Sequence, residues 1–125
     1  MDSAREKILH YMISKLKSYH NVVLLHNLSV ENVRAVIPAF EDLCKDLVAL
    51  EVDFVKSILK EGIKSGEFRS CDIGKVAQGI IDISTMTEFS TLKNFHMQPL
   101  SKKNLNDVEK RVQFMVSIVL DGIKK

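Results

Sequence analysis

The chain has 125 residues, of which 46% are hydrophobic and 27% charged, and its formal net charge is +2. This length and composition are typical of one soluble globular domain and exclude a largely disordered protein. The charge is too small to indicate a basic nucleic-acid or membrane-binding face, and neither a signal peptide nor an apolar run of ~20 residues is present. We therefore expect a cytoplasmic protein that does not contact a membrane.

Apolar residues at spacings of three and four predict a first helix from Ala4 to at least Tyr19. Asp2 or Ser3 is a suitable N-cap, and Glu6 completes a capping box with Ser3. The short apolar run that follows is interpreted as a continuation of this helix to about Asn27. The apolar stripe consists of Ile8, Leu9, Met12, Leu16 and Tyr19.

A second, short helix is predicted from Val30 to Ile37, with Ser29 as its N-cap. Pro38 predicts a break and a restart, because proline disfavours helix at the preceding residue but is tolerated at the first helical position. A long third helix then spans Pro38 to Lys64. One face of this helix is expected to join the core through Phe40, Leu43, Cys44, Leu47, Phe54, Val55, Ile58 and Gly62.

The connection after this long helix has clear turn chemistry. Gly66 stands where a left-handed C-terminal cap is needed, and Asp72 is a good N-cap for the next helix. Because residues 67–71 form a short connection, the two helices should pack as antiparallel neighbours. Phe68 is expected to close the end of their shared core.

The fourth predicted helix, from Asp72 to Thr91, has an inward apolar stripe and a neighbouring strip of small and apolar residues. A loop follows at 94–103, and the last helix begins near Ser101 or Asn106 and ends at Gly122. This last helix is apolar over more than half its circumference, which is typical of a helix buried on two sides. Its stripe contains Leu105, Val108, Val112, Met115, Val116, Val119 and Ile123, and Phe114 and Ile118 widen it.

No pattern in the sequence indicates catalysis, a metal or a cofactor. Nucleotide-binding and acyl-transfer motifs are absent, and Asp42, Asp46 and Asp53 fall on the solvent side of the long helix. Cys44 and Cys71 lie outside any CxxC motif and are read as reduced thiols, with a redox pair as the alternative. The histidines, which are His10, His20, His26 and His96, form no metal-ligand spacing.

Glu51 departs from the pattern, because it falls near the centre of the apolar arc of the long helix. A charge there costs several kcal/mol unless it is paired or hydrated. One interpretation is an ion pair with a neighbouring helix, or a slight rotation toward solvent. The alternative is that Glu51 faces a cavity and attracts a cationic or hydrogen-bonding ligand.

An apolar pocket around Glu51 is a further hypothesis, with plain core packing as its alternative. Methionine supplies adaptable walls and aromatic residues supply contact area in such pockets. The candidate lining residues are Tyr11, Met12, Phe40, Cys44, Leu47, Met86 and Phe89.

The segment from Ile58 to Asp72, read as Ile-Leu-x-x-Gly-Ile-x-x-Gly-Glu-Phe-Arg-x-x-Asp, resembles the helix junction in the effector domain of TetR-family transcriptional regulators. Three weaker matches occur in the same order as in that family. They are Glu6 to Leu9, Ser29 to Glu31 before Pro38, and Val119 to Ile123.

The resemblance implies an all-α bundle of about five helices in which residues 1–125 form one ligand-binding and dimerisation domain. It also implies a small apolar or amphipathic effector and a homodimer, with operator DNA bound only through an N-terminal head that these residues lack. The last two helices would form a four-helix bundle with their copies in a second subunit. The implied interface residues are Gly79, Ile83, Met86, Ser90, Arg111, Phe114 and Ile118.

Two other classes remain open on the sequence. The exposed apolar flank would also suit a helical protein-interaction or adaptor module, and a small helical enzyme or metal-binding bundle is the third possibility. A stable homodimer favours the regulator, a monomer favours the adaptor, and stoichiometric metal favours the last.

Overall fold

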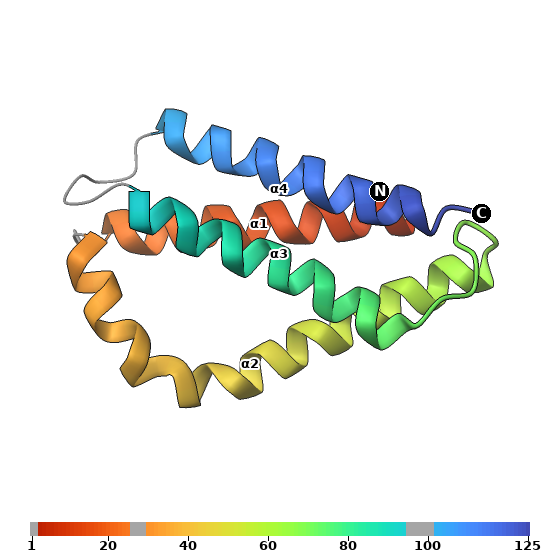
Figure 1. Cartoon of the computed structure of the whole chain (residues 1–125), viewed down its shortest axis with the longest axis horizontal. Coiled ribbons are helices and arrows are strands. Elements are labelled where there is room, and N and C mark those ends of the chain that lie inside the picture. The colour runs from red at the N-terminus through yellow and green to blue at the C-terminus, as the bar shows by residue number, and fades with distance from the viewer. Residues whose placement is uncertain (1–2, 26–29, 95–101) are drawn as a thin grey trace.

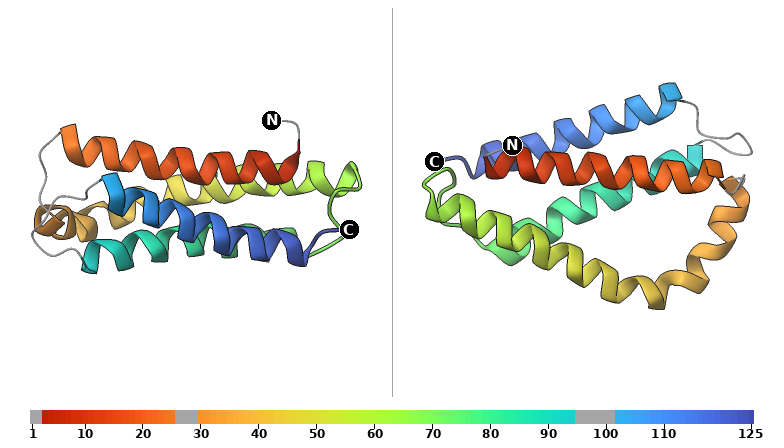
Figure 2. Two further views of the ribbon diagram at one scale, coloured as in Figure 1. Left: turned by 90° about the horizontal axis from the view of Figure 1, so that it is seen from above. Right: turned by 180° about the vertical axis from the view of Figure 1, so that it is seen from behind.

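The structure, a computed structural model, describes residues 3–25, 30–94 and 102–125, with side chains for 3–18, 47–87 and 106–125. Within these ranges the chain forms α1 (Ala4–Leu25), α2 (Val30–Lys64), α3 (Ile73–Asn94) and α4 (Lys102–Gly122). Successive helices run in opposite directions, and α1 and α3 each contact both α2 and α4 (Figures 1 and 2). The predicted all-α bundle is confirmed.

The predicted helix break at Pro38 is wrong, so the described part of the chain has four helices and not five. Val30 to Lys64 is one continuous helix. Pro38 has no N–H for the carbonyl of Arg34, but the rest of a long helix keeps its hydrogen bonds, and such a position bends a helix more readily than it ends one. Figure 1 shows α2 running steeply away from the other helices at its start, then bending and running along the bundle.

The core lies along the axis between the helices. On α1 a buried residue recurs every fourth position, at Ala4, Ile8, Met12 and Leu16. Three residues of the predicted stripe are thus buried, Leu9 is partly buried, and Tyr19 lies outside the described side chains. Fully burying one such side chain contributes about 1.5–3 kcal/mol. The other helices supply Val55, Ile58, Leu59, Phe68, Ala77, Ile80, Ile81, Val108, Val112, Val116, Leu120 and Ile123.

The predicted core face of α2 is only partly correct. Val55, Ile58 and Gly62 are buried, but Leu47 and Phe54 are exposed. At 100° per residue, Leu47 and Phe54 lie at one edge of the predicted arc, and the buried face is centred further round the helix, on Val55, Ile58, Leu59 and Gly62. Phe40, Leu43 and Cys44 lie outside the residues whose side chains are described.

The junction between α2 and α3 has the predicted caps. Gly66 has a φ of 84°, in the left-handed region, and its N–H donates to the Ile63 carbonyl at 3.1 Å. At the start of α3 the N–H of Lys75 donates to Asp72 Oδ1 at 3.1 Å, so Asp72 is the N-cap. Phe68 is buried, and it closes the end of the core as expected.

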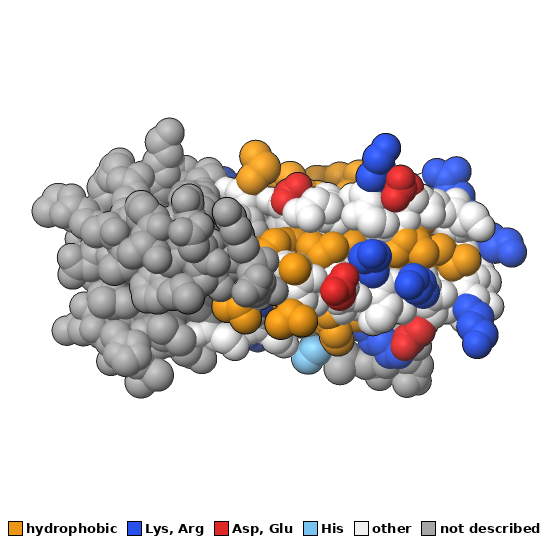
Figure 3. All heavy atoms as spheres, turned by 90° about the horizontal axis from the view of Figure 1, so that it is seen from below, with side chains coloured by type: hydrophobic (Ala, Val, Ile, Leu, Met, Phe, Trp, Pro, Cys, Tyr) orange, Lys and Arg blue, Asp and Glu red, His pale blue; other side chains and the backbone are white. Residues whose placement is uncertain are grey.

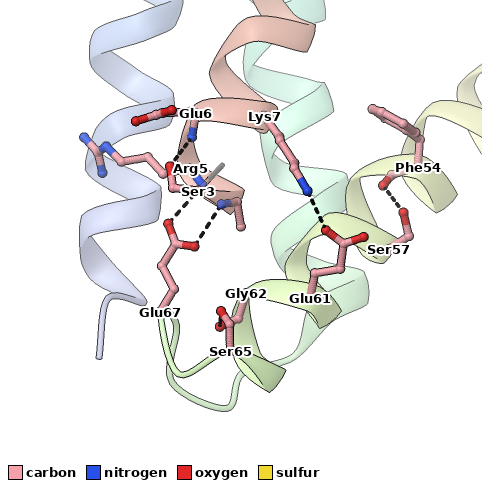
Figure 4. Close-up of polar contacts among 11 residues, drawn as sticks. Ser3, Arg5, Glu6, Lys7, Phe54, Ser57, Glu61, Gly62, Ser65 and Glu67 are labelled. Carbon is pink, nitrogen blue, oxygen red and sulfur yellow. Dashed lines mark hydrogen bonds and ion pairs between the residues drawn. The ribbon is translucent and has the colours of Figure 1, made fainter. Parts of the chain in front are cut away.

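The same junction also holds the two ends of the described chain. The Glu67 carboxylate accepts hydrogen bonds from the backbone N–H of Ala4 at 2.8 Å and of Arg5 at 3.2 Å (Figure 4). Arg69 donates from its backbone to the Ile123 carbonyl at 2.8 Å and from its guanidinium to the Gly122 carbonyl at 2.7 Å. The connection therefore caps the start of α1 and the end of α4, which are far from it in sequence.

The remaining helix boundaries follow the sequence closely. Ser3 Oγ accepts from the N–H of Glu6 at 3.0 Å, which confirms Ser3 as an N-cap of α1. α4 begins at Lys102, next to the first of its two predicted starts. None of the described helices is both long and apolar enough to cross a membrane.

Candidate functional site

A polar network joins α1 to α2 at Glu51. The Tyr11 hydroxyl donates to Glu51 Oε1 at 3.0 Å, and Lys15 Nζ lies 3.2 Å from both carboxylate oxygens. The side chains of Lys15 and Glu51 are only 22% and 20% exposed, so solvent screens this ion pair less than one on the open surface. Of the interpretations of Glu51, the ion pair with a neighbouring helix is the one observed.

Tyr11 connects this network to an aromatic contact. Its ring centroid lies 4.9 Å from that of Phe54, at an interplanar angle of 51°. Burial, and then the charge and hydrogen bond of Glu51, raise the pKa of Tyr11 to about 12. The hydroxyl therefore stays protonated near neutral pH and acts as a donor to the carboxylate.

An open cleft of about 470 Å³ lies beside this aromatic contact. Lys7 reaches from α1 across one end of it and donates to Glu61 of α2 at 3.0 Å (Figure 4). Two hydroxyl groups on its walls already have partners, since Ser57 donates to the Phe54 carbonyl and Ser14 lies 3.4 Å from His10 Nε2. The lining residues are Lys7, His10, Tyr11, Ser14, Phe54, Ser57, Ile58 and Glu61.

The cleft differs from the pocket predicted from the sequence. Tyr11 lines it and Glu51 bonds to Tyr11, but Met12 is fully buried in the core. Leu47 and Met86 are exposed and are not among the lining residues. The remaining predicted residues, Phe40, Cys44 and Phe89, lie outside the described side chains.

Most of the lining residues were not identified from the sequence, although their spacing carries a signal. On each helix they occur at positions i, i+3, i+4 and i+7, which is one face of a helix. That face mixes polar and apolar residues, so it resembles an ordinary solvent-facing surface. Only the pairing of two such faces reveals the cleft.

Both α3 and α4 carry exposed apolar side chains, which are together called the apolar strip. Met86 is 70% exposed, Phe114 68% and Ile118 56%, and Met115 is also exposed. Gly79 and Ile83 are partly buried, and among the described residues nothing beyond the helix itself lies within 4 Å of the place where a Gly79 side chain would begin. Of the predicted interface residues, Arg111 is exposed and Ser90 lies outside the described side chains.

A second exposed apolar group lies on α2 and contains Leu47, Val48, Leu50 and Phe54. Figure 3 shows the face of the bundle seen from below, where hydrophobic side chains run along the middle. Charged side chains gather toward the end that carries the α2–α3 connection.

Among the described side chains, no three histidines, cysteines or carboxylates lie close enough to hold a metal ion. Cys71 is a free, partly buried thiol. Cys44 lies outside the described side chains, so the alternative of a redox pair stays a prediction.

Comparison with known proteins finds a similar fold. No family model and no curated protein matches the sequence. A solved structure, described as a transcriptional regulator from Cytophaga hutchinsonii, aligns with a TM-score of 0.68 over 97% of this chain and 67% of its own. Because the sequence identity is 20%, this likeness shows that the two proteins share a fold.

Proposed function

We propose that this chain is the small-molecule-sensing and dimerising domain of a TetR-like transcriptional repressor. Effector binding would change the DNA affinity of a helix-turn-helix head that residues 1–125 do not include. A ligand acts in this way only if it binds the two conformations of the dimer unequally.

The observation that carries the proposal is the apolar strip on α3 and α4. Phe114 and Ile118, which are one helical turn apart on α4, lie mostly in water in a single chain, as does Met86 of α3. Contiguous exposed apolar patches mark interaction sites, and aromatic residues at their centre carry much of the binding energy. Gly79 leaves room for a second helix to approach closely.

Two independent similarities support a regulator in particular. The Ile58 to Asp72 junction resembles the TetR effector domain in sequence. In addition, the aligned Cytophaga hutchinsonii protein, whose fold this chain shares over 97% of its length, is described as a transcriptional regulator. That protein is longer than this chain, which agrees with a further domain in the full regulator.

The test is the oligomeric state in solution, measured by sedimentation velocity. We expect the wild-type chain to sediment as a dimer at micromolar concentration, with twice the 14.2 kDa mass of one chain. Phe114→Glu should weaken the dimer at least about tenfold, because it places a charge at the centre of the proposed interface. Leu50→Glu, at an equally exposed position on α2, is the matched control and should leave the dimer intact.

A wild-type chain that remains monomeric throughout the micromolar range would contradict the homodimer. The apolar strip would then favour the helical interaction or adaptor module. If Phe114→Glu and Leu50→Glu weaken the dimer equally, the interface does not lie on the apolar strip of α3 and α4.

A further inference from the structure

Two ion pairs between α1 and α2 bracket the cleft. Because the helices are antiparallel, Lys7 meets Glu61 at one end and Lys15 meets Glu51 at the other. Eight residues separate the lysines on α1, which corresponds to about 12 Å at the rise of an α-helix. The cleft lies between the two pairs and is called the trough from here on. Its length is comparable to that of two fused or linked aromatic rings.

The middle of the trough is apolar, with hydrogen-bonding groups along its edges. Phe54 is about half exposed and its ring is tilted against Tyr11, so one aromatic surface is open to a ligand. His10 and Ser14 stand on the α1 side and Ser57 on the α2 side. The volume of about 470 Å³ falls within the range of about 300–1,000 Å³ that is usual for small-molecule sites.

The charges of the trough argue for an uncharged ligand. Each carboxylate at its ends already has a lysine within 3.2 Å. An anionic ligand would have to draw a lysine away from its carboxylate, and a cationic ligand would have to displace the lysine. An uncharged aromatic molecule leaves both ion pairs in place and gains the apolar contact.

We propose that the trough between α1 and α2 binds one uncharged aromatic molecule, with a ring against Phe54 and a hydrogen-bonding substituent near His10, Ser14 or Ser57. This proposal names a ligand class for the sensing role and rests on that proposed function. Tyr11 joins the ligand to the Glu51 network, because its ring contacts Phe54 and its hydroxyl bonds to the carboxylate.

The test compares two probes that differ by one charged group. N-phenyl-1-naphthylamine is uncharged and carries one N–H donor, and 8-anilinonaphthalene-1-sulfonate has the same rings with a sulfonate added. Each is titrated into the whole 125-residue chain and followed by its fluorescence. We expect the uncharged probe to saturate at one per chain and to bind at least about tenfold more tightly than the sulfonate.

Two variants test whether the probe binds in the trough. Phe54→Ala removes the exposed ring, and Ser57→Leu fills the trough from an exposed position without touching the core. Each should weaken the uncharged probe at least about tenfold. Leu50→Ala removes an exposed apolar side chain of α2 that does not line the trough and should change the affinity less than about twofold. Circular dichroism of each variant verifies that the bundle is folded.

Several results would overturn the proposal. These are tighter binding of the sulfonate, no saturable binding of the uncharged probe, or an affinity that Phe54→Ala and Ser57→Leu both leave unchanged. A loss of affinity in Phe54→Ala and Ser57→Leu equal to that in Leu50→Ala would place the probe on exposed apolar surface in general.

The result of the probe-binding test can be distinguished from the result of the dimer test of the proposed function. The trough lies on α1 and α2, and the proposed dimer surface lies on α3 and α4. Sedimentation of the same samples therefore reports on the dimer independently of the probe. A dimer without probe binding contradicts only the ligand class, and a monomer that binds the probe contradicts the proposed regulator.

Discussion

The ring of Phe68 lies directly against the backbone of Gly62, so closely that a β-carbon on Gly62 would overlap two of its ring carbons. The same β-carbon would stand 3.0 Å from the β-carbon of Ala4. Gly62 is thus required by packing, because its own helical backbone would accept any residue. The contact explains why the junction has a glycine before its turn as well as the left-handed Gly66.

We predict that Gly62→Ala destabilises the fold by about 1–3 kcal/mol, the usual cost of overpacking a core. Chemical denaturation at a fixed chain concentration measures the change. Gly74→Ala is the matched control, because its β-carbon meets nothing closer than 3.7 Å and alanine favours a helix over glycine. Equal stability of Gly62→Ala and wild type would show that Phe68 moves aside without cost.

The capping role of Glu67 gives a second prediction. Glu67→Ala leaves the N–H groups of Ala4 and Arg5 without their carboxylate, and loss of a helix N-cap costs about 0.5–2 kcal/mol. Glu67→Gln keeps one of the two oxygen acceptors and should cost less, because it loses the charge that favours a helix N-terminus but only one of the two hydrogen bonds. Thermal or chemical unfolding distinguishes the two variants. If the glutamine variant proves as unstable as the alanine variant, one remaining acceptor oxygen contributes nothing to the cap.

Two of the interhelix ion pairs of α1 should differ in their effect on stability. Arg5 and Asp121 are 2.6 Å apart, but their side chains are 35% and 62% exposed, so Asp121→Asn should change the free energy of unfolding by less than about 1 kcal/mol. Glu51→Gln leaves Lys15 and the Tyr11 hydroxyl without a carboxylate in a less exposed place, so it should cost more. Urea denaturation of both variants measures their free energies of unfolding. A larger loss for Asp121→Asn than for Glu51→Gln would contradict this ranking.

The raised pKa of Tyr11 predicts a loss of stability in alkali. The pKa is about 12 in the folded chain, against 10.0 for an unperturbed tyrosine, so the unfolded chain loses this proton first. The stability linked to this proton is present below pH 10 and falls between pH 10 and about 12. Wild type should therefore lose more stability over this window than Tyr11→Phe.

Tyrosinate absorbance checks the assignment directly. The chain has two tyrosines and no tryptophan, so few groups absorb in the region used. We expect a late titration step that Tyr11→Phe removes and Tyr19→Phe keeps. Persistence of the late step in Tyr11→Phe would assign it to the other tyrosine.

The sequence was most informative where structure depends on neighbours along the chain. The buried stripe from Ile8 to Leu16, the left-handed Gly66 and the N-cap Asp72 follow from local periodicity and turn chemistry. Pro38 misled the prediction, because its preference for a helix start competes with the cooperativity of a long helix.

The sites that involve two helices required the tertiary structure. Glu67 caps α1 from 63 residues away, and no local pattern relates those positions. The trough exists only because two ordinary-looking helix faces meet, and the partner of Glu51 became known only when α1 was placed beside α2.

Local residue order thus specified the helices, their caps and most of their apolar faces, because these depend on backbone geometry that repeats within a few residues. The bundle decided which apolar residues stay exposed, which charges pair and where a cleft forms. These features depend on which helices pack together, and packing is a property of the whole chain.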